Sequence, residues 1–183
     1  KLDMSDTLII AVSQSGTTTD TNGTVDLVRG RGAAVIGVVN RRNSDLTDKA
    51  DGVLYTSDGR DVEMSVASTK AFYAQVAAGV LLACAITEAA GVGSDARRSA
   101  LLTSLRAVPE AMRQVLARRP TIADAAHRLA PSKRYWAIVG NGANTVAANE
   151  VRIKLSELCY KSIACDVTED KKHIDLSSEP LIL

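Results

Sequence analysis

Apolar runs and amphipathic stretches alternate through the first third of the chain. Residues 8–12 are continuously apolar, and Val25, Leu27 and Val28 then recur at helical spacing before Gly30. Residues 33–39 form a second apolar run, which is typical of a strand buried on both faces. A short helical segment around Leu46 precedes a third strand pattern at residues 52–56. This order of strands and helices predicts right-handed crossovers and a parallel sheet whose ligand site lies at the carboxyl ends of the strands.

Residues 71–90 are the longest apolar stretch, and two interpretations are open for it. A membrane span needs about 20 apolar residues with few polar interruptions. Gln75, Gly79, Thr87 and Glu88 interrupt this stretch, and neither flank is strongly basic. These features favour a helix buried against the sheet.

A second strand-and-helix unit is predicted after a break at Pro120. Apolar residues recur at helical spacing from Leu101 to Val115, and the next helix is expected to start at Thr121 and to end at Pro131. We place a domain boundary at residues 119/120. Residues 135–139 then form a strand pattern, and residues 140–142 form a glycine-containing turn.

The helix predicted after that turn carries two neighbouring stripes. The apolar stripe consists of Ala147, Val151, Leu155 and Leu158, and the charged stripe consists of Glu150, Lys154 and Glu157. Charges at these spacings commonly form ion pairs on an exposed helix face. The same charges could also serve chemistry, so both interpretations are open from the pattern alone.

Composition narrows the classes of function. The formal net charge of +1 gives no reason to expect nucleic acid or an acidic membrane as a partner. The three cysteines lack CxxC spacing and suit free thiols in a reducing, cytoplasmic compartment. With only two histidines, a histidine-based zinc site is not expected, and we predict neither metal nor cofactor. We expect no signal peptide, and we expect both ends to be cut from something longer.

The segment between the first strand and the first helix is the strongest chemical signal. It contains Ser13, Gln14, Ser15, Gly16 and Thr17–Thr19, so hydroxyls and backbone N–H groups gather at the positive end of a helix dipole. An anion such as a phosphate fits there, although a plain cluster of helix-capping residues would look similar. The turn lacks the lysine of a nucleotide P-loop. A second hydroxyl-bearing helix entrance, at Ser68 and Thr69, suits simple capping when taken alone.

Several of these motifs in this order resemble one family. Ser-Gln-Ser-Gly-x-Thr follows a strand, Val-Ala-Ser-Thr-Lys-Ala-Phe precedes a long helix, and Lys-Leu-x-Glu-Leu-x-Tyr and a histidine come later. The pattern is similar to the sugar isomerase (SIS) family, and more closely to the isomerase half of the glutamine–fructose-6-phosphate amidotransferases. The resemblance implies an α/β fold of the SIS type, with three αβα layers, a parallel sheet and parts of two tandem subdomains. Residues 1–119 would then be the latter part of the first SIS subdomain, and residues 120–183 the start of the second.

The resemblance also implies roles for individual residues. Ser13, Gln14, Ser15 and Thr18 match positions that hold the sugar phosphate, and Val66 and Ser68 match positions that contact the sugar. Glu157, Lys154 and His173 match the catalytic base, its neighbouring lysine and a ring-opening histidine. A carboxylate can move a proton between C1 and C2 of a sugar, and a histidine can act near neutral pH.

The chain also departs from the family pattern. Thr17 stands where the family usually has Glu, Ser156 replaces a lysine, and the loop before His173 lacks the family's Gly and Pro. The expected function is phosphosugar binding and aldose–ketose isomerisation within a glucosamine-6-phosphate synthase-like aminotransferase. The expected ligands are fructose 6-phosphate or glucosamine 6-phosphate, and the expected assembly is a homodimer or larger. The alternatives are a non-catalytic phosphosugar-binding module and a SIS isomerase or deaminase for another sugar phosphate.

Overall fold

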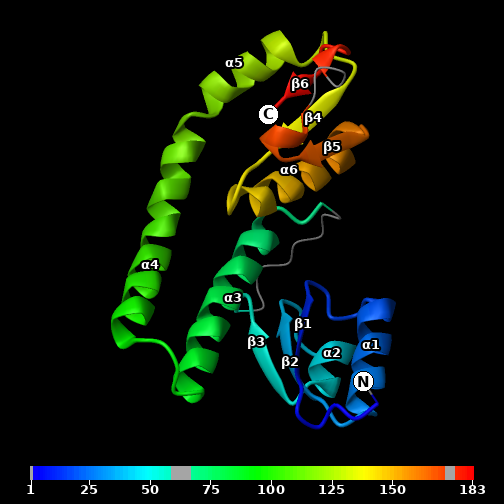
Figure 1. Ribbon diagram of the computed structural model, residues 1–183, viewed down its shortest axis with the longest axis vertical. Coiled ribbons are helices and arrows are strands. Elements are labelled where there is room, and N and C mark those ends of the chain that lie inside the picture. Colours follow the sequence, from blue (N-terminus) through cyan, green and yellow to red (C-terminus); the bar gives the residue numbers. More distant parts are fainter. Residues whose placement is uncertain (1, 59–66, 172–175) are drawn as a thin grey trace. The chain divides into compact units, whose positions relative to one another are not determined.

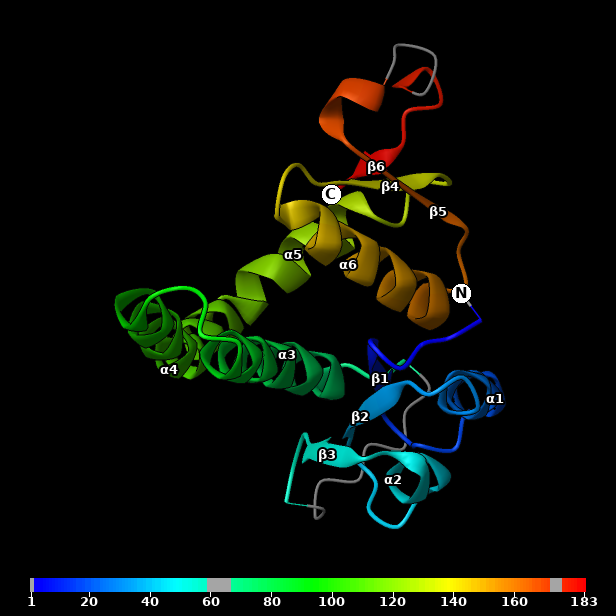
Figure 2. The same cartoon turned by 60° about the horizontal axis from the view of Figure 1, so that its bottom comes forward.

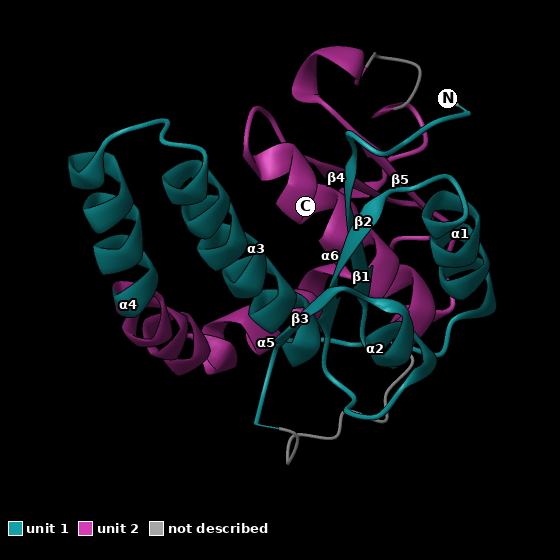
Figure 3. Cartoon of the chain, turned by 90° about the horizontal axis from the view of Figure 1, so that it is seen from below, with its two compact units in different colours: residues 1–106 teal, residues 107–183 magenta. Residues whose placement is uncertain are grey.

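The structure is a computed structural model that describes residues 2–58, 67–171 and 176–183 (Figure 1). The chain forms two compact units, residues 1–106 and 107–183, which Figure 3 shows in two colours. The division falls inside helix α4 (Asp95–Ala117). The predicted subdomain boundary at 119/120 lies instead where α4 gives way to α5 (Arg119–Leu129). That boundary concerns the family's subdomains, and it stays a prediction.

The first unit contains a three-stranded parallel sheet with strand order β1-β2-β3. The strands are β1 (Leu8–Ser13), β2 (Ala34–Val39) and β3 (Gly52–Tyr55). Helices α1 (Thr19–Arg29) and α2 (Asp45–Lys49) make the two crossovers. The predicted sequence of elements in this third of the chain is therefore confirmed.

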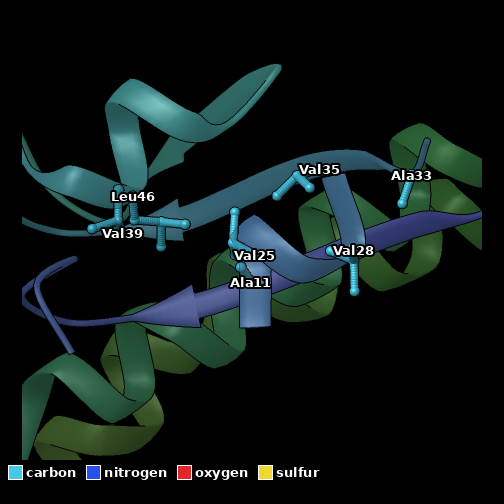
Figure 4. Close-up of a cluster of buried hydrophobic side chains, with 7 residues drawn as sticks. All are labelled: Ala11, Val25, Val28, Ala33, Val35, Val39 and Leu46. Atoms are coloured by element: carbon cyan, nitrogen blue, oxygen red, sulfur yellow. The ribbon is translucent and has the colours of Figure 1, made fainter. Parts of the chain in front are cut away.

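The core of the first unit lies between the sheet and its crossover helices. Figure 4 shows the seven buried residues of this cluster, which are Ala11, Val25, Val28, Ala33, Val35, Val39 and Leu46. Val35, Val39 and Leu46 have no exposed surface. Full burial of such a side chain contributes about 1.5–3 kcal/mol. This cluster therefore fixes α1 and α2 against the strands, and with them the turn that follows β1.

The opposite face of the same sheet turns toward α3 (Lys70–Ala89). Ile10 and Val12 alternate with the core-facing residues of β1, and together with α3 they line a cavity of about 300 Å³. This arrangement gives the unit the helix–sheet–helix layers of the expected fold.

Helix α3 is only partly buried, which corrects the expectation of a helix buried against the sheet. Ala71, Ala78 and Cys84 are buried, whereas Tyr73 and Val76 are about half exposed. A 20-residue helix is about 30 Å long, and three strands spaced about 4.8 Å apart are too narrow to cover it. Among the described helices, α3 alone is long and apolar enough to cross a membrane, a test that core helices of soluble proteins also pass.

Helix α5 begins earlier than the sequence predicts. It starts at Arg119 with Pro120 in its first turn, and it ends at Leu129, just before Pro131. Proline is well tolerated in the first helical turn because the N–H group it lacks would have no partner there. The predicted start at Thr121 is therefore two residues too late, and the predicted end before Pro131 is confirmed.

The second unit repeats the parallel arrangement with strand order β5-β4-β6. Its strands are β4 (Trp136–Val139), β5 (Ile163–Asp166) and β6 (Leu181–Ile182), and a short 3₁₀ helix, η1, spans Thr168–Asp170. Helix α6 (Asn144–Cys159) lies along this sheet (Figure 2). Ile138, Ala148 and Ile163 form the buried cluster between them.

The face that α6 turns to its sheet differs from the predicted apolar stripe. Ala148 and Leu155 pack on the core, whereas Val151 is 44% exposed and Leu158 is 58% exposed. A Cβ atom placed on Gly140 would lie 2.7 Å from the Cβ of Ala148. This close approach brings Ala148, rather than Ala147, against the end of β4 and rotates the stripe outward.

Candidate functional site

The turn after β1 is held together by contacts between its own residues. Ser13, the last residue of β1, is 8% exposed, and its Oγ accepts a hydrogen bond of 3.0 Å from the N–H of Gly16. Gly16 has a φ of +67°, a conformation that side chains other than glycine adopt at a cost. A Cβ atom at Gly16 would lie 2.0 Å from Ser44 Oγ. The position therefore requires glycine for both conformation and space.

The remaining hydroxyls of the turn lie on its outer side. Ser15 Oγ accepts the N–H of Thr17 at 3.2 Å and lies 3.0 Å from the Thr17 hydroxyl. Thr18 is exposed, and it occupies the N-cap position of α1 without a side-chain capping hydrogen bond. A capping role alone would direct the Thr18 hydroxyl at the helix N–H groups. The structure instead leaves this hydroxyl available to a ligand.

The loop after β2 and the start of α2 donate hydrogen bonds to the backbone carbonyls of the turn. The Gln14 carbonyl accepts the N–H groups of Asn40 and Arg41 at 3.3 and 3.2 Å, and the Gly16 carbonyl accepts the N–H of Leu46 at 3.0 Å. Both supporting segments belong to the first unit. The turn is therefore fixed on its carbonyl side, whereas its hydroxyls face outward.

The electrostatic surroundings of the turn suit an anion. The start of α1 carries the positive end of the helix dipole, which favours a negative ligand by about 0.3–1 kcal/mol at a surface. Arg41 and Arg42 lie in the loop after β2, separated from the strand by Asn40, and the Arg42 guanidinium lies 4.1 Å from the centre of the Tyr55 ring. Asp20 in the first turn of α1 opposes an anion. The hydroxyls and backbone N–H groups must therefore supply most of the affinity.

The predicted sugar-contact residues lie at the entrance of α3. Ser68 is half buried and has a φ of +37°, an uncommon conformation for serine. It precedes Thr69, the N-cap residue of α3, which makes no side-chain capping hydrogen bond. Simple capping by Thr69 is therefore not what the structure shows. Val66 lies outside the described residues.

The charged stripe of α6 contains an ion pair between Lys154 and Glu150. Lys154 Nζ lies 2.6 Å from Glu150 Oε1, and both side chains are about one-fifth exposed. Glu157 is exposed near the end of α6. This pair is one of the helix-face ion pairs that the sequence pattern left open, and the catalytic roles of Lys154 and Glu157 stay predictions. His173 lies outside the described residues.

Asn22 is a site residue that the sequence pattern did not reveal. It lies on the core face of α1, is 6% exposed, and contacts the carbonyl groups of the turn. The sequence does hold one sign of this role. Asn22, Val25 and Val28 are spaced three residues apart on one helix face, so Asn22 is a polar residue at a position where an apolar one is expected.

No group of three or more histidine, cysteine or acidic side chains able to hold a metal ion occurs among the described residues. The turn after β1 offers hydroxyls and backbone N–H groups. These are ligands for a phosphate group and the hydroxyls of a sugar.

Residues 4–85 match the family description "SIS domain". The chain carries a SIS domain. The matched range covers the whole sheet of the first unit, the turn after β1 and most of α3. The part of the chain that matches the SIS domain therefore contains the candidate anion site.

Relatives with curated names extend the likeness beyond the SIS domain. Over 154 residues the chain is 38% identical to a glutamine–fructose-6-phosphate aminotransferase (isomerizing) of Leifsonia xyli, covering 84% of this chain and 24% of the relative. Over 167 residues it is 36% identical to the enzyme of the same name from Mycolicibacterium smegmatis, covering 91% of this chain and 26% of the relative. The chain thus spans about a quarter of the length of these relatives.

Solved structures give the same fold. The C-terminal domain of glucosamine-fructose-6-phosphate aminotransferase from Francisella tularensis matches with a TM-score of 0.84 and 25% identity, over 93% of this chain and 48% of that chain. Tagatose-6-phosphate ketose/aldose isomerase from Escherichia coli matches with a TM-score of 0.64 and 17% identity, over 93% of this chain and 45% of that chain. The expected SIS-type α/β fold and the resemblance to the aminotransferase family are both confirmed.

Proposed function

We propose that this protein binds the phosphate group of a hexose 6-phosphate at the turn formed by Ser13, Gln14, Ser15 and Thr18. The observation that carries the proposal is the outward arrangement of the Ser15, Thr17 and Thr18 hydroxyls at the start of α1. Relatives named for fructose 6-phosphate support this choice of ligand. Fructose 6-phosphate and glucosamine 6-phosphate are the first ligands to test.

The proposed reaction is aldose–ketose isomerisation within a glucosamine-6-phosphate synthase-like aminotransferase. Glu157 would move the proton between C1 and C2, Lys154 would stabilise the negative charge that develops on oxygen, and His173 would assist ring opening. Val66 and Ser68 would contact the sugar. We further propose a cytoplasmic protein that acts as a homodimer or larger assembly.

A second candidate function is phosphosugar binding without catalysis. The ion pair between Lys154 and Glu150, with Glu157 exposed, favours it, because the lysine is then engaged away from the proposed base. This candidate shares the anion site with the first, so the two differ only in turnover.

Isothermal titration calorimetry of a double variant tests the binding site. Ser15→Ala with Thr18→Ala removes two hydroxyls from the outer side of the turn. Each hydrogen bond to a charged group is worth about 1.5–3 kcal/mol, so affinity for fructose 6-phosphate should fall at least about tenfold.

The matched control removes the same residue types elsewhere. Ser132→Ala with Thr24→Ala deletes hydroxyls whose partners are backbone carbonyls of Leu129 and Asp20, outside the turn. The control should bind as the parent protein does, and neither protein should bind unphosphorylated fructose comparably. Unchanged affinity in the Ser15/Thr18 double variant would refute the site.

A further inference from the structure

The side chain of Asn22 connects helix α1 to the anion-binding turn. Its Nδ2 donates to the Gly16 carbonyl and to the Thr18 carbonyl, both at 3.1 Å. The N–H of Leu46, on α2, donates to the same Gly16 carbonyl at 3.0 Å. Two elements therefore hold one carbonyl of the turn from the core side.

Fixing that carbonyl also fixes the next N–H group. In a planar trans peptide the carbonyl of Gly16 and the N–H of Thr17 point in opposite directions. Because the Gly16 carbonyl faces Asn22 and the interior, the Thr17 N–H faces the outer side, where it reaches Ser15 Oγ at 3.2 Å. This outer side is the one that carries the exposed threonine hydroxyls.

Asn22 occupies its position at a cost. It is 6% exposed, and its Oδ1 is buried without a hydrogen-bond partner among the described residues. A buried polar atom without a partner destabilises a fold. An apolar residue would suit the register that Asn22 shares with Val25 and Val28, but it could not make the two hydrogen bonds that the Asn22 amide donates to the turn.

We propose that Asn22 is a positioning residue that orients the turn for a phosphate group. It touches no ligand itself. It holds the Gly16 carbonyl inward, and thereby directs the Thr17 N–H and the neighbouring hydroxyls at the phosphate oxygens. The inference rests on the proposed phosphosugar binding.

The test compares Asn22→Leu with Val25→Ala in the full chain. Leucine fills the space without the Nδ2 donor, whereas Val25→Ala weakens the same helix face without touching the turn. Calorimetry with fructose 6-phosphate should show a loss of about tenfold for Asn22→Leu, the worth of one to two neutral hydrogen bonds. Val25→Ala should bind within about twofold of the parent.

Amide hydrogen exchange gives a readout that a merely structural role would not move. The Gly16 N–H donates to Ser13 Oγ, and the Leu46 N–H donates to the Gly16 carbonyl. Both amides should exchange faster in Asn22→Leu than in Val25→Ala. Should Asn22→Leu fail to fold, Asn22→Ser removes the same reach with a smaller side chain and carries the same test. Parent-like affinity in the Asn22 variant, or an equal loss in Val25→Ala, would overturn the inference.

The failure of the proposed function is distinguishable from the failure of this inference. If the parent protein binds neither fructose 6-phosphate nor glucosamine 6-phosphate, the proposed function is wrong. Amide exchange then decides the inference alone. Faster exchange at Gly16 in the Asn22 variant would then show that Asn22 holds the backbone of the turn, although not for a sugar phosphate, and equal exchange in both variants would overturn that part of the inference as well.

Discussion

The turn after β1 and the turn after β4 join a parallel strand to a helix in the same way, yet they use their polar groups differently. In the second turn, Asn141 exchanges two hydrogen bonds of 3.0 Å with Thr168, and the Thr145 hydroxyl donates to the Gly140 carbonyl at 2.9 Å. Its side chains therefore satisfy one another and the neighbouring loop. In the first turn the buried contacts are made mostly by backbone carbonyls, and the hydroxyls of Thr17 and Thr18 remain outside.

The difference shows that a strand–turn–helix connection does not itself make an anion site. Both helices offer backbone N–H groups at their first turn. The N-cap position is Thr18 in α1 and Ala143 in α6, so only the first offers a hydroxyl there. This comparison favours the first unit for the proposed phosphate binding, and the proposed chemistry of the second unit lies along α6.

The largest expected effect is a loss of turnover on substitution of Glu157, the proposed base on α6. Glu157→Gln keeps the size and polarity of the side chain but removes the base. Isomerisation turnover with fructose 6-phosphate should fall by about 10²–10⁴, the usual contribution of a general base. Affinity for the sugar phosphate, measured by calorimetry, should remain nearly intact because the proposed anion site lies in the first unit.

Glu150→Gln is the matched control on the same helix. It breaks the ion pair with Lys154 while leaving Glu157 in place. A smaller loss than for Glu157→Gln is expected. A larger loss would transfer the role of the base to Glu150. Near-normal turnover in both variants and in Lys154→Met would leave the charged stripe as an ion-pair face, and the non-catalytic binding module would then be the better function.

The next largest effect is a difference in stability between alanine substitutions of the glycines in the two turns, Gly16 and Gly142. Gly16→Ala introduces a side chain at positive φ and against Ser44, so the free energy of unfolding should fall by about 2–5 kcal/mol. Gly142 also has a positive φ, but nothing lies within 4 Å of a Cβ atom there. Gly142→Ala should therefore cost only about 1–2 kcal/mol.

Urea unfolding and calorimetry together check this pair. Gly16→Ala should lose hexose phosphate binding, whereas Gly142→Ala should keep it at temperatures where both variants are folded. Loss of binding in Gly142→Ala alone would reverse the assignment of the two turns.

The parts of the molecule that the sequence predicts correctly are those governed by local pattern. The apolar runs at residues 8–12 and 33–39 became adjacent parallel strands. The second run is mostly buried, as expected of a strand covered on both faces, whereas Ile10 and Val12 of the first run are about half exposed. The hydroxyl-rich turn was visible because Ser and Thr gather around one glycine before a helix. Both features need only neighbouring residues to be recognised.

The parts that the sequence did not predict depend on contacts between distant segments. The role of Asn22 requires knowing that its amide reaches Gly16, six residues back and around a turn. The true buried face of α6 depends on the close approach of Gly140 to Ala148, which helical spacing alone does not reveal. The partial exposure of α3 depends on the width of the sheet beneath it.

The smallest expected effect concerns the end of the first sheet that lies away from the turn. Asp51 accepts the N–H of Val35 at 2.8 Å and pairs with Arg29 at 2.7 Å, at the amino ends of the strands. The hydrogen bond from Arg29, followed by that from the Val35 N–H, lowers the pKa of Asp51 below its ordinary value. A carboxyl group with a lowered pKa stabilises the fold above its unfolded-state pKa of about 3.9, and this contribution is lost as the pH falls through the folded-state value.

Asp51→Asn should therefore lower the urea midpoint at pH 7, and the difference from the parent protein should shrink as the pH falls below about 4. The effect should be small because the carboxylate is about half exposed and solvent screens its ion pair. Hexose phosphate affinity at pH 7 should not change, since the carboxylate lies at the opposite ends of the strands from Ser13. A change in affinity would mean that the two ends of the sheet are coupled, and the turn could then no longer be treated as the independent site that the comparison with the second unit implies.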